Sequence, residues 1–194
     1  IELPSKGLMY PEDNPLSSGK VEIKYMTAKE EDILTNSSFI KKGNVLDKLL
    51  ESVIISKIDI DDLIVGDKNA LLIATRILGY GSQYEVEING EIENIDLSQL
   101  ENKEFDSSQI TQGLNEFNFT LPHTDTPITY KILTGRDEKK LEKEIEGIKR
   151  IKKDSNPSLS TRLKYIITSV KGDIERKSIN EFVDVYLLAK DSKA

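Results

Sequence analysis

The pattern of hydrophobic and polar positions divides the chain into an extended start, a mixed middle and a helical end. Residues 1–20 hold three of the six prolines, with turn-forming serine, asparagine and glycine between them. This composition predicts an extended arm that lies either against its own body or against a neighbour. We expect an α+β protein with an arm over 1–20, an α+β core over 21–133 and a helical segment over 134–194.

The core is predicted to begin with a strand and to contain three helices. Alternation over 21–26 indicates the strand. Thr27 and Glu30 have the spacing of a capping box, which starts the first helix at that point. Apolar positions over 45–54 form one face of a second helix. Asp67 is the expected N-cap of a third helix over 68–78, whose apolar run on all sides indicates a buried helix.

Two strand pairs form the predicted sheet of the core. Residues 84–88 and 91–97 flank Asn89-Gly90, the favoured pair for a two-residue hairpin turn. Residues 117–122 and 128–133 indicate a second pair. A small antiparallel sheet with its polar face toward solvent follows from these patterns.

The residues after 133 predict three antiparallel helices. In the first, Leu141, Ile145 and Ile148 recur at steps of four and three between charged positions. So narrow a seam is typical of a helix that a partner helix covers. Coverage by the two following helices is the alternative. An apolar face over 159–170 predicts the second helix, and a capping box at Ser178–Glu181 predicts the start of the third.

Composition excludes several kinds of chemistry. The chain has no cysteine and a single histidine, His123, which excludes disulfides, thiolate zinc sites, iron–sulfur clusters and multi-histidine metal sites. His123 stands in a Pro/Thr/Asp turn with Asp125 nearby, a setting that favours a surface histidine over a catalytic one. No apolar run approaches the ~18 residues that a membrane span needs. We expect no catalytic residues, metal, cofactor or membrane span.

Charge is unevenly distributed. Residues 1–133 carry 12 Lys and Arg against 23 Asp and Glu, whereas residues 134–194 carry 15 against 11, within a total net charge of −7. An acidic body disfavours nucleic acid as a partner. The asymmetry could steer a protein partner, and two differently solvated surfaces are the alternative.

Eight residues are candidates for contacts with a partner protein. The arm has four side chains too apolar for a free tail, and the seam has three. Arg76 interrupts an apolar helix, either as a paired or snorkelling arginine or as one that is buried only when a partner docks. The candidates are Leu3, Leu8, Met9, Tyr10, Arg76, Leu141, Ile145 and Ile148.

Several stretches, taken in order, resemble the T4-type bacteriophage baseplate hub assembly proteins. The resemblance covers about residues 1–100, with a weaker echo at 182–192, and it depends on the ordered set rather than on one motif. The stretches are LPSKGLMYP at 3–11, MTAKEEDILTN at 26–36, IKKG at 40–43, LDKLL at 46–50, LIVGDK at 63–68 and RILGYGSQY at 76–84.

The resemblance implies a non-enzymatic role in building the central hub of a contractile tail, through contacts with other hub proteins in the host cytoplasm. Relatives commonly carry a Cys-x-x-Cys pair in the hairpin, where this chain has Val86 to Glu91, so no zinc is implied. A permanent subunit of the virion baseplate is the first alternative. A small hydrolase using His123 and a host-directed adaptor are the others.

Overall fold

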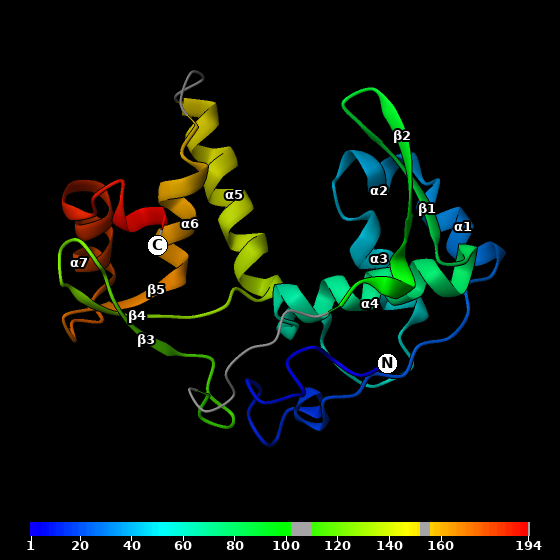
Figure 1. Cartoon of the computed structure of the whole chain (residues 1–194), viewed down its shortest axis with the longest axis horizontal. Coiled ribbons are helices and arrows are strands. Elements are labelled where there is room, and N and C mark those ends of the chain that lie inside the picture. Colours follow the sequence, from blue (N-terminus) through cyan, green and yellow to red (C-terminus); the bar gives the residue numbers. More distant parts are fainter. Residues whose placement is uncertain (102–109, 152–155, 194) are drawn as a thin grey trace. The chain divides into compact units, whose positions relative to one another are not determined.

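The chain forms two compact units with an α+β fold overall, in agreement with the predicted fold class. The computed structural model describes residues 1–101, 110–151 and 156–193. The units are Ile1–Gly113 and Leu114–Ala194 (Figure 1). The division lies before the strand pair that was predicted for the core, not after residue 133. The reason is that this pair is completed by a third strand from the second unit.

The first unit is mainly helical and carries one β-hairpin (Figure 1). Its elements follow one another in the chain with short connections. They are the 3-10 turn Pro15–Ser18, α1 Ala28–Leu34, α2 Ser37–Lys41, α3 Val45–Val53, the 3-10 turn Ile60–Asp62, α4 Val65–Tyr80, β1 Gln83–Ile88, β2 Glu91–Asp96 and the 3-10 turn Leu97–Gln99.

The N-terminal segment belongs to the hydrophobic interior of this unit. Leu3 and Leu16 are buried, as are Leu50 of α3 and Leu71 of α4 in the same unit. The backbone N–H of Leu3 donates to the carbonyl of Gly19 at 2.8 Å, which folds the segment back on itself. Of the two arrangements expected for residues 1–20, the structure has the one in which the segment lies against its own body.

Asp67 attaches this segment to α4. The helix begins at Val65, so Asp67 lies inside its first turn and is not the N-cap that the sequence predicts. Its fully buried carboxylate accepts hydrogen bonds from the Ser5 hydroxyl at 2.6 Å, the Ser5 backbone N–H at 3.0 Å and the Tyr10 hydroxyl at 2.6 Å. Burial, with the bond to Asp67, raises the pKa of Tyr10 far above its ordinary value, so Tyr10 stays a neutral donor.

Glu30 joins α1 to α3. The predicted capping box is confirmed, since the carboxylate accepts the Thr27 backbone N–H at 2.8 Å and the Thr27 hydroxyl at 2.7 Å. The same fully buried carboxylate accepts from Lys24 Nζ at 2.8 Å and from the Ser52 hydroxyl of α3 at 2.6 Å. These hydrogen bonds, the one from Lys24 foremost, hold the pKa of Glu30 well below its usual range.

The prediction of a strand over 21–26 is wrong. This stretch forms only an isolated bridge, between Ile23 and Ile54. The alternating pattern correctly indicates an extended backbone, but a ladder needs an extended partner. The partner here is the short turn after α3, which accommodates one bridge.

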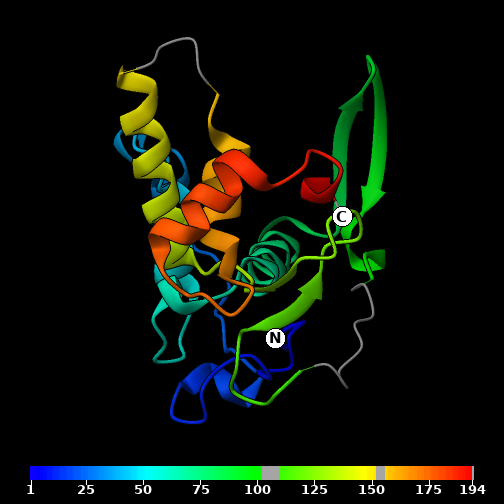
Figure 2. The same cartoon turned by 90° about the vertical axis from the view of Figure 1, so that its left-hand side faces the viewer.

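The hairpin β1–β2 has the predicted turn. Asn89 and Gly90 have φ values of 54° and 86°, as a type I′ turn requires. Figure 2 looks nearly along α4 and shows the hairpin on one side of that helix and α1–α3 on the other.

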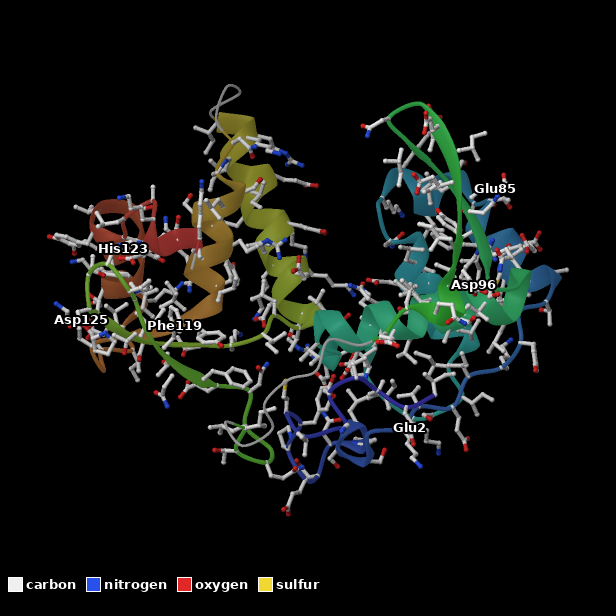
Figure 3. All side chains as sticks on the ribbon, in the orientation of Figure 1. Glu2, Glu85, Asp96, Phe119, His123 and Asp125 are labelled. Atoms are coloured by element: carbon white, nitrogen blue, oxygen red, sulfur yellow. The ribbon has the colours of Figure 1, made fainter. Side chains whose placement is uncertain are left out.

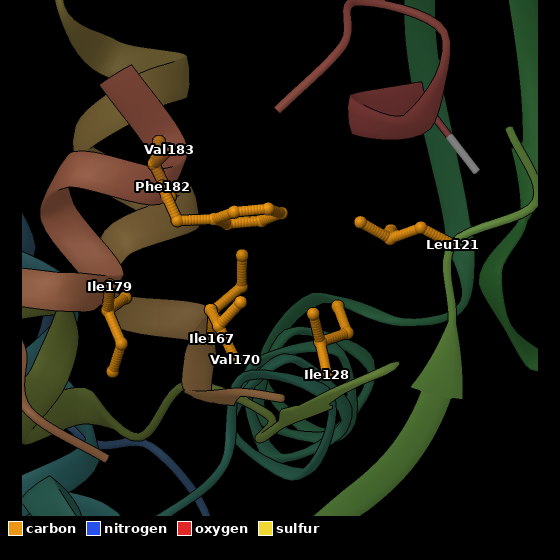
Figure 4. Close-up of a cluster of buried hydrophobic side chains, with 7 residues drawn as sticks. All are labelled: Leu121, Ile128, Ile167, Val170, Ile179, Phe182 and Val183. Atoms are coloured by element: carbon orange, nitrogen blue, oxygen red, sulfur yellow. The ribbon is translucent and has the colours of Figure 1, made fainter. Parts of the chain in front are cut away.

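The second unit packs helices against a three-stranded antiparallel sheet of order β3-β4-β5. Its interior contains Leu121, Ile128, Ile167, Val170, Ile179, Phe182 and Val183, and in Figure 4 the Phe182 ring points toward Leu121. The elements are β3 Phe117–Thr120, β4 Pro127–Tyr130, α5 Gly135–Ile151, α6 Ser158–Ile166, β5 Ile167–Val170, α7 Arg176–Glu181, the π-helical turn Phe182–Tyr186 and the 3-10 turn Asp191–Lys193.

Two predictions for this unit need correction. The helix expected over 159–170 ends at Ile166, because the β-branched residues that follow pair with β4 as β5. The last helix begins at Arg176 with Glu175 as N-cap, so the capping box expected at Ser178 is not its start. The helical segment after residue 133 therefore contains a strand.

The contact between Tyr10 and Asp67 predicts a specific loss of stability. Tyr10→Phe removes the hydroxyl that donates to Asp67 and accepts the Ile64 backbone N–H at 3.1 Å. We expect the free energy of unfolding to fall by about 1–3 kcal/mol, because two buried polar groups lose a partner. Urea denaturation measures it. Tyr25→Phe, at a tyrosine that is 70% exposed, is the control and should leave the midpoint unchanged.

The environment of Glu30 predicts a pH-dependent stability. A carboxylate whose pKa is lowered on folding adds stability above its unfolded pKa, near 4.5, and loses it as the pH falls toward the folded value. At neutral pH the urea midpoint of the native protein should be higher than that of Glu30→Gln. The difference between the two midpoints should become smaller below pH 4.5. Asp32→Asn, at an exposed carboxylate of the same helix, is the control and should leave the urea midpoint at neutral pH close to that of the native protein. A difference between native protein and Glu30→Gln that is constant with pH would contradict this account.

Candidate partner-binding surfaces

Three of the four apolar arm residues proposed as partner contacts are inside the protein. Leu3, Met9 and Tyr10 are buried, and Leu8 is half-buried. The Leu8 carbonyl accepts the Gly113 backbone N–H at 2.8 Å, so this stretch also meets the end of its own unit. The three buried side chains offer no surface to a partner. They are buried within the first unit, where Ser5 and Tyr10 of the same segment bind Asp67 of α4.

Arg76 is a paired arginine at the end of α4. Its guanidinium donates to the Gly81 carbonyl at 3.1 Å and to the Gln83 carbonyl at 3.5 Å. It also lies 4.8 Å from the centre of the Tyr80 ring and 5.6 Å from that of Tyr84, which are cation–π distances. The side chain fastens the base of the hairpin to α4, and its interruption of an apolar helix has a structural explanation.

The seam on α5 is covered at its beginning and open at its end. Leu141 is fully buried, Ile145 and Ile148 are half-buried, and Ile151 is 85% exposed. The following helix α6 packs along α5 within the chain. The covered part is flanked by an ion pair between Arg162 and Glu138 at 2.6 Å and by the Tyr165 hydroxyl on Glu144 at 2.9 Å. Coverage within the chain therefore holds at the beginning of the helix, and coverage by a partner stays a prediction for its exposed end.

The hairpin is a surface that sequence reasoning missed. Side chains of directly opposed residues share a face, and the register pairs Tyr84 with Ile95, Val86 with Glu93 and Ile88 with Glu91. One face therefore combines four apolar side chains with two carboxylates. Tyr84 and Ile88 are each 43% exposed. Glu85 and Asp96, which Figure 3 labels on this hairpin, belong to its opposite face. Alternation revealed the strands, but only the structure shows that the sheet stops at two.

The second unit contains an apolar pocket of about 270 Å³ between its sheet, α6 and the C-terminal segment. Phe119, Leu121, Ile128 and Leu163 are among its lining residues. Asp191 lies at the edge, and its carboxylate closes that end of the unit by accepting hydrogen bonds from the β3–β4 turn.

His123 lies on the surface of that turn. Its backbone N–H, not its ring, donates to Asp191 at 2.9 Å, and Figure 3 shows the residue beside Asp125. The residue is exposed, as the interpretation of a surface histidine expects.

Within residues 1–101, 110–151 and 156–193, no three or more His, Cys, Asp or Glu side chains gather in a way that could hold a metal ion. In the same described ranges, none of the helices has the length and apolar character to cross a membrane.

Comparison with protein-family models, with curated proteins and with solved structures finds no match to the chain. The resemblance to baseplate hub assembly proteins therefore depends on the quoted stretches alone.

The uneven coverage of α5 predicts uneven effects of truncation. Leu141→Ala empties a fully buried site and should lower the free energy of unfolding by about 2–5 kcal/mol. Ile148→Ala, at a half-buried position of the same helix, is the matched control and should have a smaller effect. Thermal unfolding of both variants measures the difference. Equal losses would contradict the described gradient of burial along α5.

Proposed function

We propose that the chain is a non-enzymatic assembly protein of the baseplate hub of a contractile phage tail. It acts through contacts with other hub proteins in the host cytoplasm. The observation that carries the proposal is the ordered resemblance over residues 1–100.

The resembling stretches contact one another in the first unit, which supports treating them as one set. The stretch 3–11 supplies Ser5 and Tyr10, and the stretch 63–68 supplies Asp67, which binds both. The stretch 76–84 supplies Tyr80, whose hydroxyl donates to Glu31 of the stretch 26–36. Helix α4 thus holds one stretch at its beginning and another at its end.

Exposed apolar side chains support a role in protein–protein contacts. Tyr84 and Ile88 on the hairpin and Ile151 at the end of α5 are large hydrophobic residues at the surface. Exposed apolar groups that lie together are typical of surfaces that bind other proteins. These residues replace the buried arm residues as candidates for partner contacts.

The test is made in cells infected by the phage that encodes the chain. A tagged copy isolated late in infection should co-purify with other hub proteins, identified by mass spectrometry. Deleting the gene should leave tails without a complete hub, and a plasmid copy should restore infectious particles. A full yield of infectious particles without the gene would overturn the proposal.

Two further measurements separate the alternatives. An assembly factor should be missing from purified particles, whereas a permanent baseplate subunit should be present in them. His123→Ala removes the one histidine ring that a hydrolase could use, and it should restore assembly as well as the native chain. Loss of assembly by a folded His123→Ala protein would favour the enzyme.

A further inference from the structure

The apolar face of the hairpin is only partly covered by the residues that the structure describes. A two-stranded ribbon is marginally stable in water unless a third element covers its apolar face. Here Tyr84 and Ile88 are 43% exposed, and Val86 and Ile95 on the same face are half-buried. Arg76 fastens only the base of the ribbon. Part of the apolar surface of the hairpin is therefore accessible to another molecule.

Charge restricts what can cover this face. Residues 83–96 contain five acidic side chains and neither lysine nor arginine. Glu91 and Glu93 lie on the apolar face itself, because they oppose Ile88 and Val86. A second hairpin placed on this face would bring like charges together, which is unfavourable. The occupant must combine apolar and basic side chains.

The two units of this chain have net charges of opposite sign, as contact between an acidic surface and a basic one requires. The first unit, residues 1–113, has 11 Lys and Arg against 21 Asp and Glu, a net charge of −10. The second unit, residues 114–194, has 16 against 13, a net charge of +3. Between two molecules, electrostatic steering therefore favours contact of a first unit with a second unit over contact of like units.

The end of α5 has the required combination. Ile151 is 85% exposed, and Ile145 and Ile148 are half-buried. Lys149 and Arg150 occupy the last turn, and Lys149 shares a face with Ile145 because it follows four residues later. The Arg150 ion pair with Glu146, at 3.7 Å between exposed side chains, stabilises little and gives way readily to a better partner.

The two surfaces are also comparable in length. The apolar positions of β1 from Tyr84 to Ile88 span about 13 Å at the rise of a strand. The helix from Ile145 to Ile151 spans about 9 Å. One helix end can therefore cover most of the apolar stripe of one hairpin.

We propose that the hairpin β1–β2 of one molecule docks on the end of α5 of a second copy of this chain. The four apolar side chains of the hairpin would pack on Ile148 and Ile151, with Glu91 and Glu93 facing Lys149, while Arg150 adds positive charge to the same helix end. Each molecule offers one hairpin and one helix end, so the contact is head to tail and builds a ring or an open chain. The proposal does not depend on a role in phage tails.

Sedimentation velocity of the full chain over a range of concentrations tests the proposal. Native protein should associate increasingly with concentration, and less at ~0.5 M salt than at ~0.05 M, because salt screens the charge pairs. Glu91→Lys with Glu93→Lys should weaken association roughly tenfold or more, and so should Lys149→Glu with Arg150→Glu. Mixing these two variants should restore association, since one retains the native helix end and the other the native hairpin.

Glu85→Lys with Glu87→Lys is the matched control. It makes the same change in net charge on the opposite face of the same hairpin and should leave association close to that of the native chain. Circular dichroism checks that every variant is folded. Native protein that stays monomeric at all concentrations would overturn the proposal. The proposal would also be wrong if either charge-reversed variant, of the hairpin or of the helix end, associated as strongly as the native protein. Failure of the two charge-reversed variants to associate when mixed would contradict it as well.

Discussion

The buried carboxylate of Asp67 is the interaction on which the first unit depends. It accepts three hydrogen bonds from Ser5 and Tyr10, and through them an extended segment of irregular backbone becomes part of the interior. A buried carboxylate without partners would be strongly destabilising, so the segment and the helix need each other. With the segment held in this way, its side chains Leu3, Met9 and Leu16 are buried in the first unit.

Other junctions between segments use the same device. Glu30 links α1 to Ser52 of α3, and Asp191 links the C-terminal segment to the β3–β4 turn. Asp137, in the first turn of α5, accepts from Lys131 Nζ at 2.9 Å and from the Thr134 backbone N–H at 3.2 Å. A chain with only 37% hydrophobic residues has limited apolar area to bury. Hydrogen bonds to buried carboxylates add stability and fix the geometry in which its segments meet.

The surfaces left over after this internal pairing explain where partners can bind. The arm and Arg76 are occupied within the first unit, and the beginning of the α5 seam is covered in the second. Among the surfaces that stay open in the described residues are the acidic, apolar hairpin and the end of α5, which carries Lys149 and Arg150 beside the exposed Ile151. The proposed self-association and the proposed contacts with other proteins involve the same two surfaces, so the two kinds of contact would compete for them.

Local patterns in the sequence determined much of this protein. The capping box at Thr27, the helix over 45–53 and the Asn89-Gly90 turn all depend on neighbours in the chain, and all three are present as predicted. The α+β class followed from the same patterns.

Tertiary structure alone decided the rest. Asp67 has the same local pattern whether it caps a helix or binds Ser5 and Tyr10, more than fifty residues away. The residues from Ile167 to Val170 continue an apolar helical face, but pairing with β4 makes them a strand. The sequence does not show whether an apolar side chain is covered by its own chain or by a partner, because the hydrophobic effect is non-directional and either cover removes the side chain from water. Leu3 and Ile151 therefore looked alike in the sequence, and only the fold buried the first and exposed the second.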